Sequence, residues 1–416
     1  MPQPPISQHH GSQHHVLLAV SGGIAAVKAP ELVRALRKAG LAVRCVTTRN
    51  AAHFVAPLAL QALSGESVRT DLFDPEQEGK IDHIALADWA DAVVVAPATA
   101  DLLAKMAHGI ADDLVSTLLL ATRAPVLVAP SMNVNMWRHA ATQANVATLR
   151  ERGVRFVGPD SGWLACGWEG EGRMAEPAAI AGEVERALGA PTLAGETVVV
   201  TAGGTREPID PVRVLANRSS GKMGFEIAAA AARRGAEVVL VAGPTSLATP
   251  AGVRRVAVET ALEMRAAVHA ELARCTVFVA AAAVSDFRPA APAKQKIKKE
   301  SLADDAGLTI ELVRNPDILA EVCRAPGRAG RTVIGFAAES EDVIAAARRK
   351  LERKGCDGIV ANDVSRADAG FDVDTNAVTF VWPGGDAESL PLLSKREVAE
   401  RLLDRVEKLR AARSTS

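Results

Sequence analysis

Short apolar runs alternate with amphipathic segments along the first half of the chain. The apolar runs are bounded by glycine, proline or polar residues, as is typical of buried strands. They cover residues 14–20, 41–47, 92–96, 124–129 and 154–157. The segments between them have the spacing of helices and cover residues 24–39, 101–107, 112–121, 137–152 and 177–188. This alternation predicts a parallel sheet with helices on both faces.

The second half repeats the scheme. Strands are predicted at residues 197–201, 238–242, 277–281, 333–337 and 358–360, with an edge strand at 377–382. Helices are predicted at residues 222–234, 264–274, 317–323 and 342–354, with a closing amphipathic helix at 395–410. Because each half opens with a strand, a glycine turn and a helix, we predict two doubly wound, Rossmann-like α/β domains.

A linker is expected between the two patterns. A chain of 416 residues is too long for one ordinary core, so about two domains are expected. Residues 189–195 carry glycine and proline between the last helix of the first half and the first strand of the second. We therefore predict domains at 1–190 and 191–416.

Composition excludes several classes of partner. The net charge is −1, so no global field would attract nucleic acid or an anionic membrane. No run approaches the roughly 18 apolar residues of a membrane span. Residues 1–15 lack the apolar core of a signal peptide and predict a disordered extension. The five cysteines include no C-x-x-C pair, which argues against a zinc site or disulfide framework and favours a soluble protein of the reducing cytoplasm.

Candidate chemistry in the first half gathers where strands end. Asn133, within residues 130–137, follows a predicted strand, and its amide suits a substrate carboxylate or a flavin edge. The methionines and tryptophan around it would either exclude water from a site or simply fill the core. Gly22 and Gly23 stand between a strand and a helix, which suits a phosphate but equally a tight turn. They do not form the G-x-G-x-x-G dinucleotide fingerprint.

Two further residues are isolated candidates. His83 can act as a base near neutral pH, although a lone histidine is more often structural. Cys166 lies in the glycine-rich stretch 159–174, which predicts a mobile flap instead of a core element. A buried structural cysteine is the alternative.

The second half suggests a nucleotide site. Residues 219–222 invite a P-loop interpretation, but Ala216 and Met223 stand where that motif needs glycine and Ser or Thr. Asp286 ends a predicted strand, where a carboxylate suits a ribose or a base. Four lysines fall within residues 294–299. Such a run is usually a solvated loop. No aromatic residues interleave with the lysines, so among functional interpretations a flap over a nucleotide triphosphate is favoured over nucleic-acid binding.

Several of these segments resemble known motifs. Residues 130–137 are similar to the P-x-M-N-x-x-M-W signature of the flavin-dependent cysteine decarboxylases, and residues 83–91 to their H-I-x-L…W-A-D segment. Residues 165–174 resemble their A-C-G…G-x-G-R-M motif, although Trp168 replaces a common acidic residue. From about Val16 to about Leu403 the chain resembles the bifunctional coenzyme A biosynthesis proteins, which join phosphopantothenoylcysteine decarboxylase to phosphopantothenate–cysteine ligase.

For the first domain, the resemblance implies a flavodoxin-like fold that binds FMN. The implied cofactor-binding residues are Gly22, Gly23, Ile24, Thr48, Thr99, Ala100, Asp101, Leu102 and Ser131, with Asp101 replacing an asparagine of some relatives. The implied reaction oxidises the substrate thiol to a thioaldehyde with FMN as electron acceptor, which permits loss of CO2. In that reaction His83 is the base, Asn133 holds the carboxylate and Cys166 donates a proton.

For the second domain, the resemblance implies CTP-dependent ligation. Residues 205–224 are similar to the ligase motif T-R-E-P-x-D-P-V-R…N-x-S-S-G-K-M-G, in which Arg213 and Asn217 face the substrate. Lys296 corresponds to the catalytic lysine of the K-I-K-K motif. The implied CTP-binding residues are Ala283, Asp286, Lys296, Pro316, Asp317, Ile318, Leu319, Phe336, Lys350 and Lys354. Phosphopantothenate would form an acyl-cytidylate that cysteine then attacks, with Mg²⁺ bridging the phosphates through ligands that the sequence does not identify.

The expected partners are small molecules, namely 4'-phosphopantothenate, cysteine and CTP, with neither nucleic acid nor membrane. The resemblance also implies a homo-oligomer of decarboxylase trimers and ligase dimers, with a dodecamer as one arrangement and flavin near the subunit boundary. Two alternatives remain open at this point. One is a regulatory, phosphatase-inhibiting relative of the decarboxylases, and the other is a decarboxylase of peptidyl cysteines fused to an unrelated domain.

Overall fold

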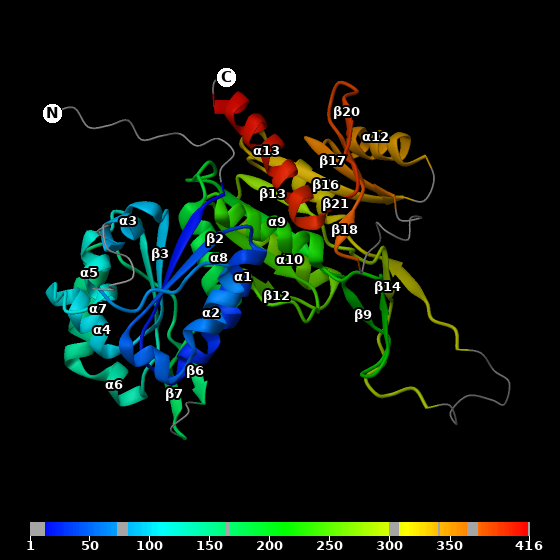
Figure 1. The fold of residues 1–416 in the computed structure, drawn as a ribbon. Coiled ribbons are helices and arrows are strands. Elements are labelled where there is room, and N and C mark those ends of the chain that lie inside the picture. The colour runs from blue at the N-terminus through cyan, green and yellow to red at the C-terminus, as the bar shows by residue number, and fades with distance from the viewer. Residues whose placement is uncertain are drawn as a thin grey trace. The chain divides into compact units, whose positions relative to one another are not determined.

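The computed structural model describes residues 13–72, 82–163, 167–298, 308–339, 342–363 and 373–414. The chain divides into two compact units, Met1–Gly189 and Ala190–Ser416, and each contains its own main sheet (Figure 1). Both are α/β units built on parallel strands, which confirms the predicted fold class. Among the described residues no helix combines the length and apolarity needed to cross a lipid bilayer.

The first unit contains a five-stranded parallel sheet with the order β2-β1-β3-β4-β5. Its strands are β1 (His15–Val20), β2 (Ala42–Thr47), β3 (Ala92–Ala98), β4 (Val126–Pro130) and β5 (Arg155–Phe156). This is the flavodoxin-like order, in which the winding of the chain reverses between β1 and β3. A ligand crevice is expected at the carboxyl ends of those two strands.

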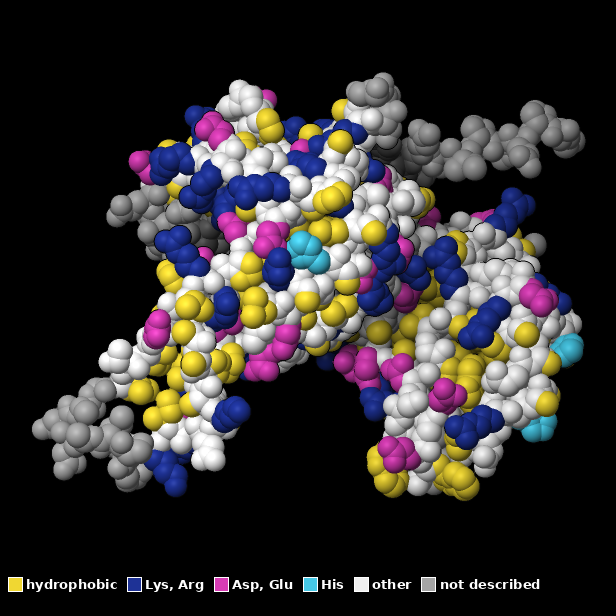
Figure 2. Space-filling model, turned by 180° about the vertical axis from the view of Figure 1, so that it is seen from behind, with side chains coloured by type: hydrophobic (Ala, Val, Ile, Leu, Met, Phe, Trp, Pro, Cys, Tyr) yellow, Lys and Arg dark blue, Asp and Glu magenta, His cyan; other side chains and the backbone are white. Residues whose placement is uncertain are grey.

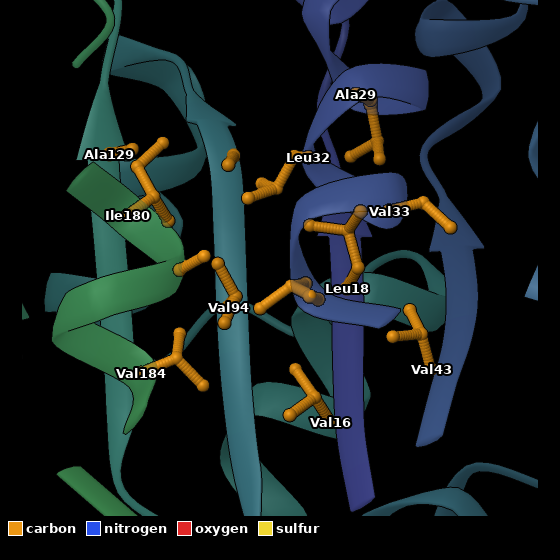
Figure 3. Close-up of a cluster of buried hydrophobic side chains, with 14 of the residues drawn as sticks. Val16, Leu18, Ala29, Leu32, Val33, Val43, Val94, Ala129, Ile180 and Val184 are labelled. Carbon is orange, nitrogen blue, oxygen red and sulfur yellow. The ribbon is translucent and has the colours of Figure 1, made fainter. Parts of the chain in front are cut away.

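Helices cover both faces of this sheet. One face carries α1 (Ala29–Lys38), α2 (Pro57–Ser64) and α8 (Pro177–Leu188), and the other carries α3 (Asp82–Trp89), α4 (Ala100–His108), α5 (Leu114–Ala121) and α7 (Ala140–Glu151). Successive strand residues enter opposite cores, so Leu18 packs with the first set of helices and Leu17 with the second. Figure 3 shows the first core, in which Leu32 of α1 and Val184 of α8 approach the same sheet face.

Two predictions about this unit need correction. The segment 137–152 is not one helix, because His139 has extended backbone between α6 (Val134–Arg138) and α7, and its Nδ1 accepts a hydrogen bond from Ala141 N at 3.2 Å. The glycine-rich stretch lies outside the main sheet, as predicted, but it contains two antiparallel strands, β6 (Asp160–Trp163) and β7 (Glu169–Arg173), whose register shifts between Asp160 and Ser161. Short 3-10 helices, η1 (Ile24–Lys28) and η2 (Arg49–His53), follow β1 and β2.

The second unit contains an eight-stranded sheet with the order β12-β11-β8-β13-β16-β17-β19-β20. Its strands are β8 (Thr197–Ala202), β11 (Glu237–Ala242), β12 (Val253–Ala257), β13 (Val277–Ala280), β16 (Thr332–Glu339), β17 (Gly358–Asp363), β19 (Val378–Val381) and β20 (Ala387–Ser389). The first six in sheet order are parallel and follow the Rossmann arrangement, which reverses between β8 and β13. The last two are antiparallel.

Five helices cover this second sheet. One face carries α9 (Lys222–Arg233) and α13 (Lys395–Ser414), and the other carries α10 (Ala261–Glu271), α11 (Ile318–Arg324) and α12 (Val343–Lys354).

On the face of the molecule drawn in Figure 2, basic and acidic side chains are interspersed, in keeping with the near-neutral net charge.

The edges of this sheet differ from the prediction. The predicted edge strand is β19, but it pairs with both β17 and β20, so β20 forms that edge. The other edge, β12, was not predicted because Arg254 and Arg255 interrupt its apolar pattern, as charged residues often do on edge strands. Three small antiparallel pairs were also missed, namely β9 (Arg206–Pro208) with β10 (Val214–Ala216), β14 (Phe287–Pro289) with β15 (Leu312–Arg314), and β18 (Thr375–Asn376) with β21 (Leu393–Ser394).

Candidate active sites

The first unit has a cavity of 690 Å³ where its sheet order reverses. Ser21 follows β1, Thr48 follows β2 and Thr99 follows β3, and all three line the cavity. Its size lies within the range of small-molecule and cofactor sites. The cavity is therefore at the position that this class of sheet uses for a ligand.

Most of the residues predicted to bind a cofactor are found here. Those that line the cavity are Gly22, Thr48, Thr99, Ala100, Asp101 and Leu102, whereas Gly23, Ile24 and Ser131 do not. Lining residues that were not predicted are Ser21, Arg49, Asn50, Thr70, Asp71, Leu72, Lys105, Asp112, Asp113, Leu114 and Met136. Residues 70–72 reach the cavity because Arg69 bridges to Val46 of β2, a tertiary pairing with no local sequence signal.

Hydrogen bonds hold two of the strand ends together. Ser21 Oγ donates to the carbonyl of Pro97 at 2.7 Å and accepts from Thr99 N at 3.2 Å. Thr99 also caps α4, because its Oγ1 accepts from Leu102 N at 3.3 Å. The backbone N–H groups at the start of α4 therefore face the cavity, where a helix N-terminus favours an anion.

The cavity suits a polar, anionic cofactor such as FMN in two further respects. The Oγ1 of Thr48 is buried without a hydrogen-bond partner among the described residues, so it can serve a ligand. Gly22 shapes the cavity wall, since a Cβ there would lie 2.5 Å from Asn50 Cβ and would push apart the segments that follow β1 and β2. The donor groups that would hold FMN are therefore present at the strand ends.

The rim of the cavity is acidic. Lys105 Nζ lies 2.9 Å from Asp112, 3.6 Å from Asp101 and 3.9 Å from Asp113. The hydrogen bond to Asp112 raises the pKa of the Lys105 ammonium group and lowers the pKa of the Asp112 carboxyl group. One lysine among three carboxylates disfavours an anion at this rim, which leaves the start of α4 as the better place for a phosphate.

Asn133 is positioned by its own helix and by the glycine-rich hairpin. Its Oδ1 accepts from Asn135 N at 2.8 Å and caps α6. Next to it, Met132 N donates to the carbonyl of Gly172 in β7 at 3.0 Å. A Cβ at Gly170 would lie 2.9 Å from Val134 Cγ2, so this strand packs tightly on the Asn133 loop. A carboxylate ligand would have to be bound by the donor end of the Asn133 amide, Nδ2.

The apolar residues around Asn133 have different roles. Trp137 is buried in the core against the sheet, so it fills the core instead of lining a site. Met136 is about half exposed and lines the cavity, so it is the apolar residue that can contact a ligand there.

Neither of the predicted decarboxylase residues that the structure describes lines this cavity, and Asn133 is absent from its wall although Met136 of the same segment is present. His83 is half-buried on α3 and does not line it. Cys166 lies outside the described residues, between the two strands of the hairpin.

The second unit has a cavity of 450 Å³, also where its sheet order reverses. Predicted residues that line it are Asn217, Ala283, Asp286, Phe336 and Lys350. Unpredicted lining residues include Arg218, Lys222, Asn362, Asn376 and Lys395. Lys222 Nζ lies 2.7 Å from Asp374 and so joins the start of α9 to the segment before β18.

Arg213 contacts the lysine-rich segment of the second unit. Asp210 Oδ2 accepts from Arg213 Nη1 at 2.9 Å and from Ile297 N at 3.1 Å. Arg213 also donates to the carbonyl of Ile297 at 3.1 Å. Lys296 is exposed next to this junction, and Asn217 Nδ2 donates to the carbonyl of Val284 at 3.1 Å. Asp210 thus holds Arg213 next to the segment that carries Lys296, whereas Asn217 is bound separately to Val284 and, of the three predicted catalytic residues, lines the cavity.

A second group of predicted residues lies between α11 and α12. Lys354 forms an ion pair with Asp317, which caps α11, and Lys350 Nζ donates to the carbonyl of Phe336 at 2.6 Å. Burial lowers the pKa of Lys354, which Asp286 partly opposes. Pro316, Asp317, Ile318, Leu319 and Lys354 do not line the cavity. Ile318 and Leu319 are buried in the core, so only their backbone can meet a nucleotide.

The comparisons with known proteins cover both units. The family described as "Flavoprotein" matches residues 5–189, and "DNA/pantothenate metabolism flavoprotein C-terminal domain" matches residues 193–409. The coenzyme A biosynthesis bifunctional protein CoaBC of Escherichia coli K12 is 51% identical over 393 residues, which are 94% of this chain and 96% of that protein. CoaBC of Bacillus subtilis is 44% identical over 399 residues, 95% of this chain and 97% of that protein.

Solved structures of similar proteins cover single units. The C-terminal domain of a CoaBC is 39% identical, covers 53% of this chain and 98% of that structure, and superposes with a TM-score of 0.45. The FMN-binding protein AtHal3 is 35% identical, covers 42% of this chain and 95% of that structure, and superposes with a TM-score of 0.37.

The fold, the two cavities and both family matches define a two-domain flavoprotein of pantothenate metabolism. The chain belongs to the family of coenzyme A biosynthesis bifunctional proteins CoaBC. It is a bifunctional enzyme of coenzyme A biosynthesis, with phosphopantothenoylcysteine synthetase and FMN-dependent decarboxylase activities. This excludes the regulatory and peptidyl-cysteine alternatives.

Proposed function

We propose that the two activities are separated along the chain, with the decarboxylase in residues 1–190 and the CTP-dependent ligase in residues 191–416. The observation that carries this proposal is that each unit has its own cavity at its own sheet reversal. The ligase would join cysteine to 4'-phosphopantothenate, and the decarboxylase would convert the product to 4'-phosphopantetheine.

In the decarboxylase, FMN would lie in the first cavity, held by the N–H groups that begin α4 and by Thr48 and Thr99. When bound, FMN supplies the electron acceptor and donor that loss of CO2 from a cysteine carboxylate requires. Asn133 would bind the carboxylate through Nδ2, and the docked hairpin would exclude water from that contact. Cys166 would then protonate the product carbon.

His83 would complete the decarboxylase site across a subunit boundary. His83 lies on α3, and the resemblance to the decarboxylases implies a flavin near the subunit boundary, so we propose a homo-oligomer, with decarboxylase trimers, in which a neighbouring copy provides His83. Mixing His83→Ala and Asn133→Ala proteins, each inactive alone, should then restore part of the decarboxylation. Failure of refolded mixtures to regain activity would favour a site within one chain.

In the ligase, CTP would lie in the second cavity. Arg213 and Asn217 would orient phosphopantothenate, and Lys296 would neutralise charge as pyrophosphate leaves. Mg²⁺ would be bound mainly by phosphate oxygens, as is usual for this ion.

We place the enzyme in the cytoplasm. Four cysteines are buried and form no disulfide bond, which suits a reducing compartment, namely Cys45, Cys275, Cys323 and Cys356.

The test separates the two half-reactions. Purified protein should be yellow, and it should release CMP from CTP with phosphopantothenate, cysteine and Mg²⁺. Lys296→Gln should abolish CMP release but leave CO2 release from supplied phosphopantothenoylcysteine, and Cys166→Ser should bind that substrate without completing turnover. Lys294→Gln, a neighbouring exposed lysine, is the matched control. Loss of both activities in Lys296→Gln would contradict the separation.

A further inference from the structure

Two buried asparagines lie on the wall of the second cavity, and both are far from Asn217 in the sequence. Asn362 is in β17 and is 9% exposed, and Asn376 is in β18 and is 3% exposed. Both line the cavity. In each, the side-chain Oδ1 is buried and has no hydrogen-bond partner among the described residues.

Such a pair is unusual for a structural role. A buried acceptor without a donor loses its hydration and gains nothing in return, so native proteins rarely retain one without a bound group. Asn362 ends the otherwise apolar run of β17, where Val378 is its partner on β19. An apolar residue would satisfy the packing at this position, which indicates that the amide serves a ligand.

The cations around the pair do not supply the missing donors. Lys350 Nζ donates to the carbonyl of Phe336, Lys395 Nζ to the carbonyl of Val373, and Lys222 Nζ contacts Asp374. An amide oxygen only accepts hydrogen bonds, so the group that fits these two atoms must bear N–H or O–H protons. A phosphate or carboxylate would place its own acceptor oxygens against the two amide oxygens, which is unfavourable.

Resting on the proposed ligase function, we infer that Asn362 and Asn376 form a subsite for the amino group of a substrate. Two of the proposed substrates carry such a group, the exocyclic amine of cytosine in CTP and the α-amine of cysteine. Bound to cytosine, the pair would reject uracil, which presents an acceptor where cytosine presents the amine. Bound to cysteine, it would hold the nucleophile in the cavity that Asn217 also lines.

The test uses Asn362→Leu and Asn376→Leu in the full-length protein. Leucine has the same number of side-chain heavy atoms as asparagine and the same branching at Cγ but no acceptor, so it removes the unsatisfied oxygen together with the subsite. We expect an unchanged or higher melting temperature together with a rise of about tenfold or more in one substrate's KM. Asn376→Asp, which keeps acceptor oxygens, should recover part of the loss. Thr379→Val on β19, a polar-to-apolar change at a half-buried position, is the control.

The kinetic arms identify the source of the amine. If cytosine is bound, the KM for CTP rises and the preference for CTP over UTP falls about tenfold, while the KM for cysteine is unchanged. If cysteine is bound, its KM rises and the preference for CTP is kept. Unchanged constants for both substrates, or an activity loss that only follows a lower melting temperature, would overturn the inference. Failure of the unmodified protein to release CMP from CTP would instead overturn the proposed ligase function.

Discussion

Met132 N donates a hydrogen bond to the carbonyl of Gly172 at 3.0 Å, and a Cβ at position 172 would lie 2.3 Å from Met132 O. The backbone of Gly172 is also in a region that favours glycine, with φ of +145°. The two segments therefore meet backbone to backbone, which places the glycine-rich hairpin against the Asn133 loop.

Gly172→Ala should reduce decarboxylation strongly, by about tenfold or more, because the hairpin can no longer dock on the Asn133 loop. CMP release by the ligase should be unaffected. Both activities are measured on the same preparation. Gly153→Ala provides the comparison, since that glycine also has positive φ but faces open space. Equal losses of decarboxylation in the two variants would show general destabilisation instead.

Asp210→Asn should reduce ligation and spare decarboxylation. Asp210 Oδ1 accepts from the N–H groups of Val212 and Arg213, and Oδ2 accepts from Ile297 N and Arg213 Nη1. An asparagine retains only one acceptor oxygen, so one of these pairs of bonds is lost and Lys296 is no longer fixed beside Arg213. We expect a fall in ligase kcat of about tenfold or more. Glu311→Gln, an exposed carboxylate of the same unit, should have little effect.

The same carboxylate should make ligation sensitive to acid. Burial raises the pKa of Asp210, but the backbone donors and the Arg213 charge outweigh burial and lower it overall. A carboxyl group with a lowered folded-state pKa stabilises the fold above its unfolded pKa of about 3.9 and loses that effect as pH falls through the folded value. Asp210→Asn should therefore lack the acid-dependent component of inactivation below about pH 4. Identical acid profiles for both proteins would contradict this role.

Arg234→Met should destabilise the packing of α13 on α9. Arg234 is 14% exposed and contacts Glu400, Asp404 and Glu407 at 2.6–2.8 Å. Its removal takes one or more donors from each of the three carboxylates, although Glu400 keeps Arg233 and Glu407 keeps Thr192. We therefore expect a loss of about 2 kcal/mol in the opening free energy of α13, measured by amide hydrogen exchange. Arg405→Met removes an exposed ion pair with Glu388 and should lose less than about 1 kcal/mol. A similar loss in both would refute the special role of burial.

The sequence predicted some elements of the fold and of the sites better than others. The apolar runs 197–201 and 238–242 predicted β8 and β11. Glycine and proline at 189–195 predicted the boundary between the two units along the chain. Gly22 was predicted at the site from its place at a strand end and Thr48 from the resemblance to the flavin-dependent decarboxylases, and both line the cavity. These predictions succeed because apolar periodicity and turn chemistry act over a few neighbouring residues.

Other features needed the fold. Asn362 and Asn376 meet Asn217 at one cavity although they are far away in sequence. Ile318 and Leu319 were predicted to contact CTP, yet their side chains are in the core because α11 turns that face to the sheet.

The sequence by itself thus determined the two α/β units, most of their strands and the family to which the chain belongs. The tertiary structure alone decided which side chains line each cavity, which are buried in a core and which acceptors remain unsatisfied. The reason is physical: strand and helix formation depend on local patterns, whereas a site depends on long-range packing that joins the carboxyl ends of separate strands.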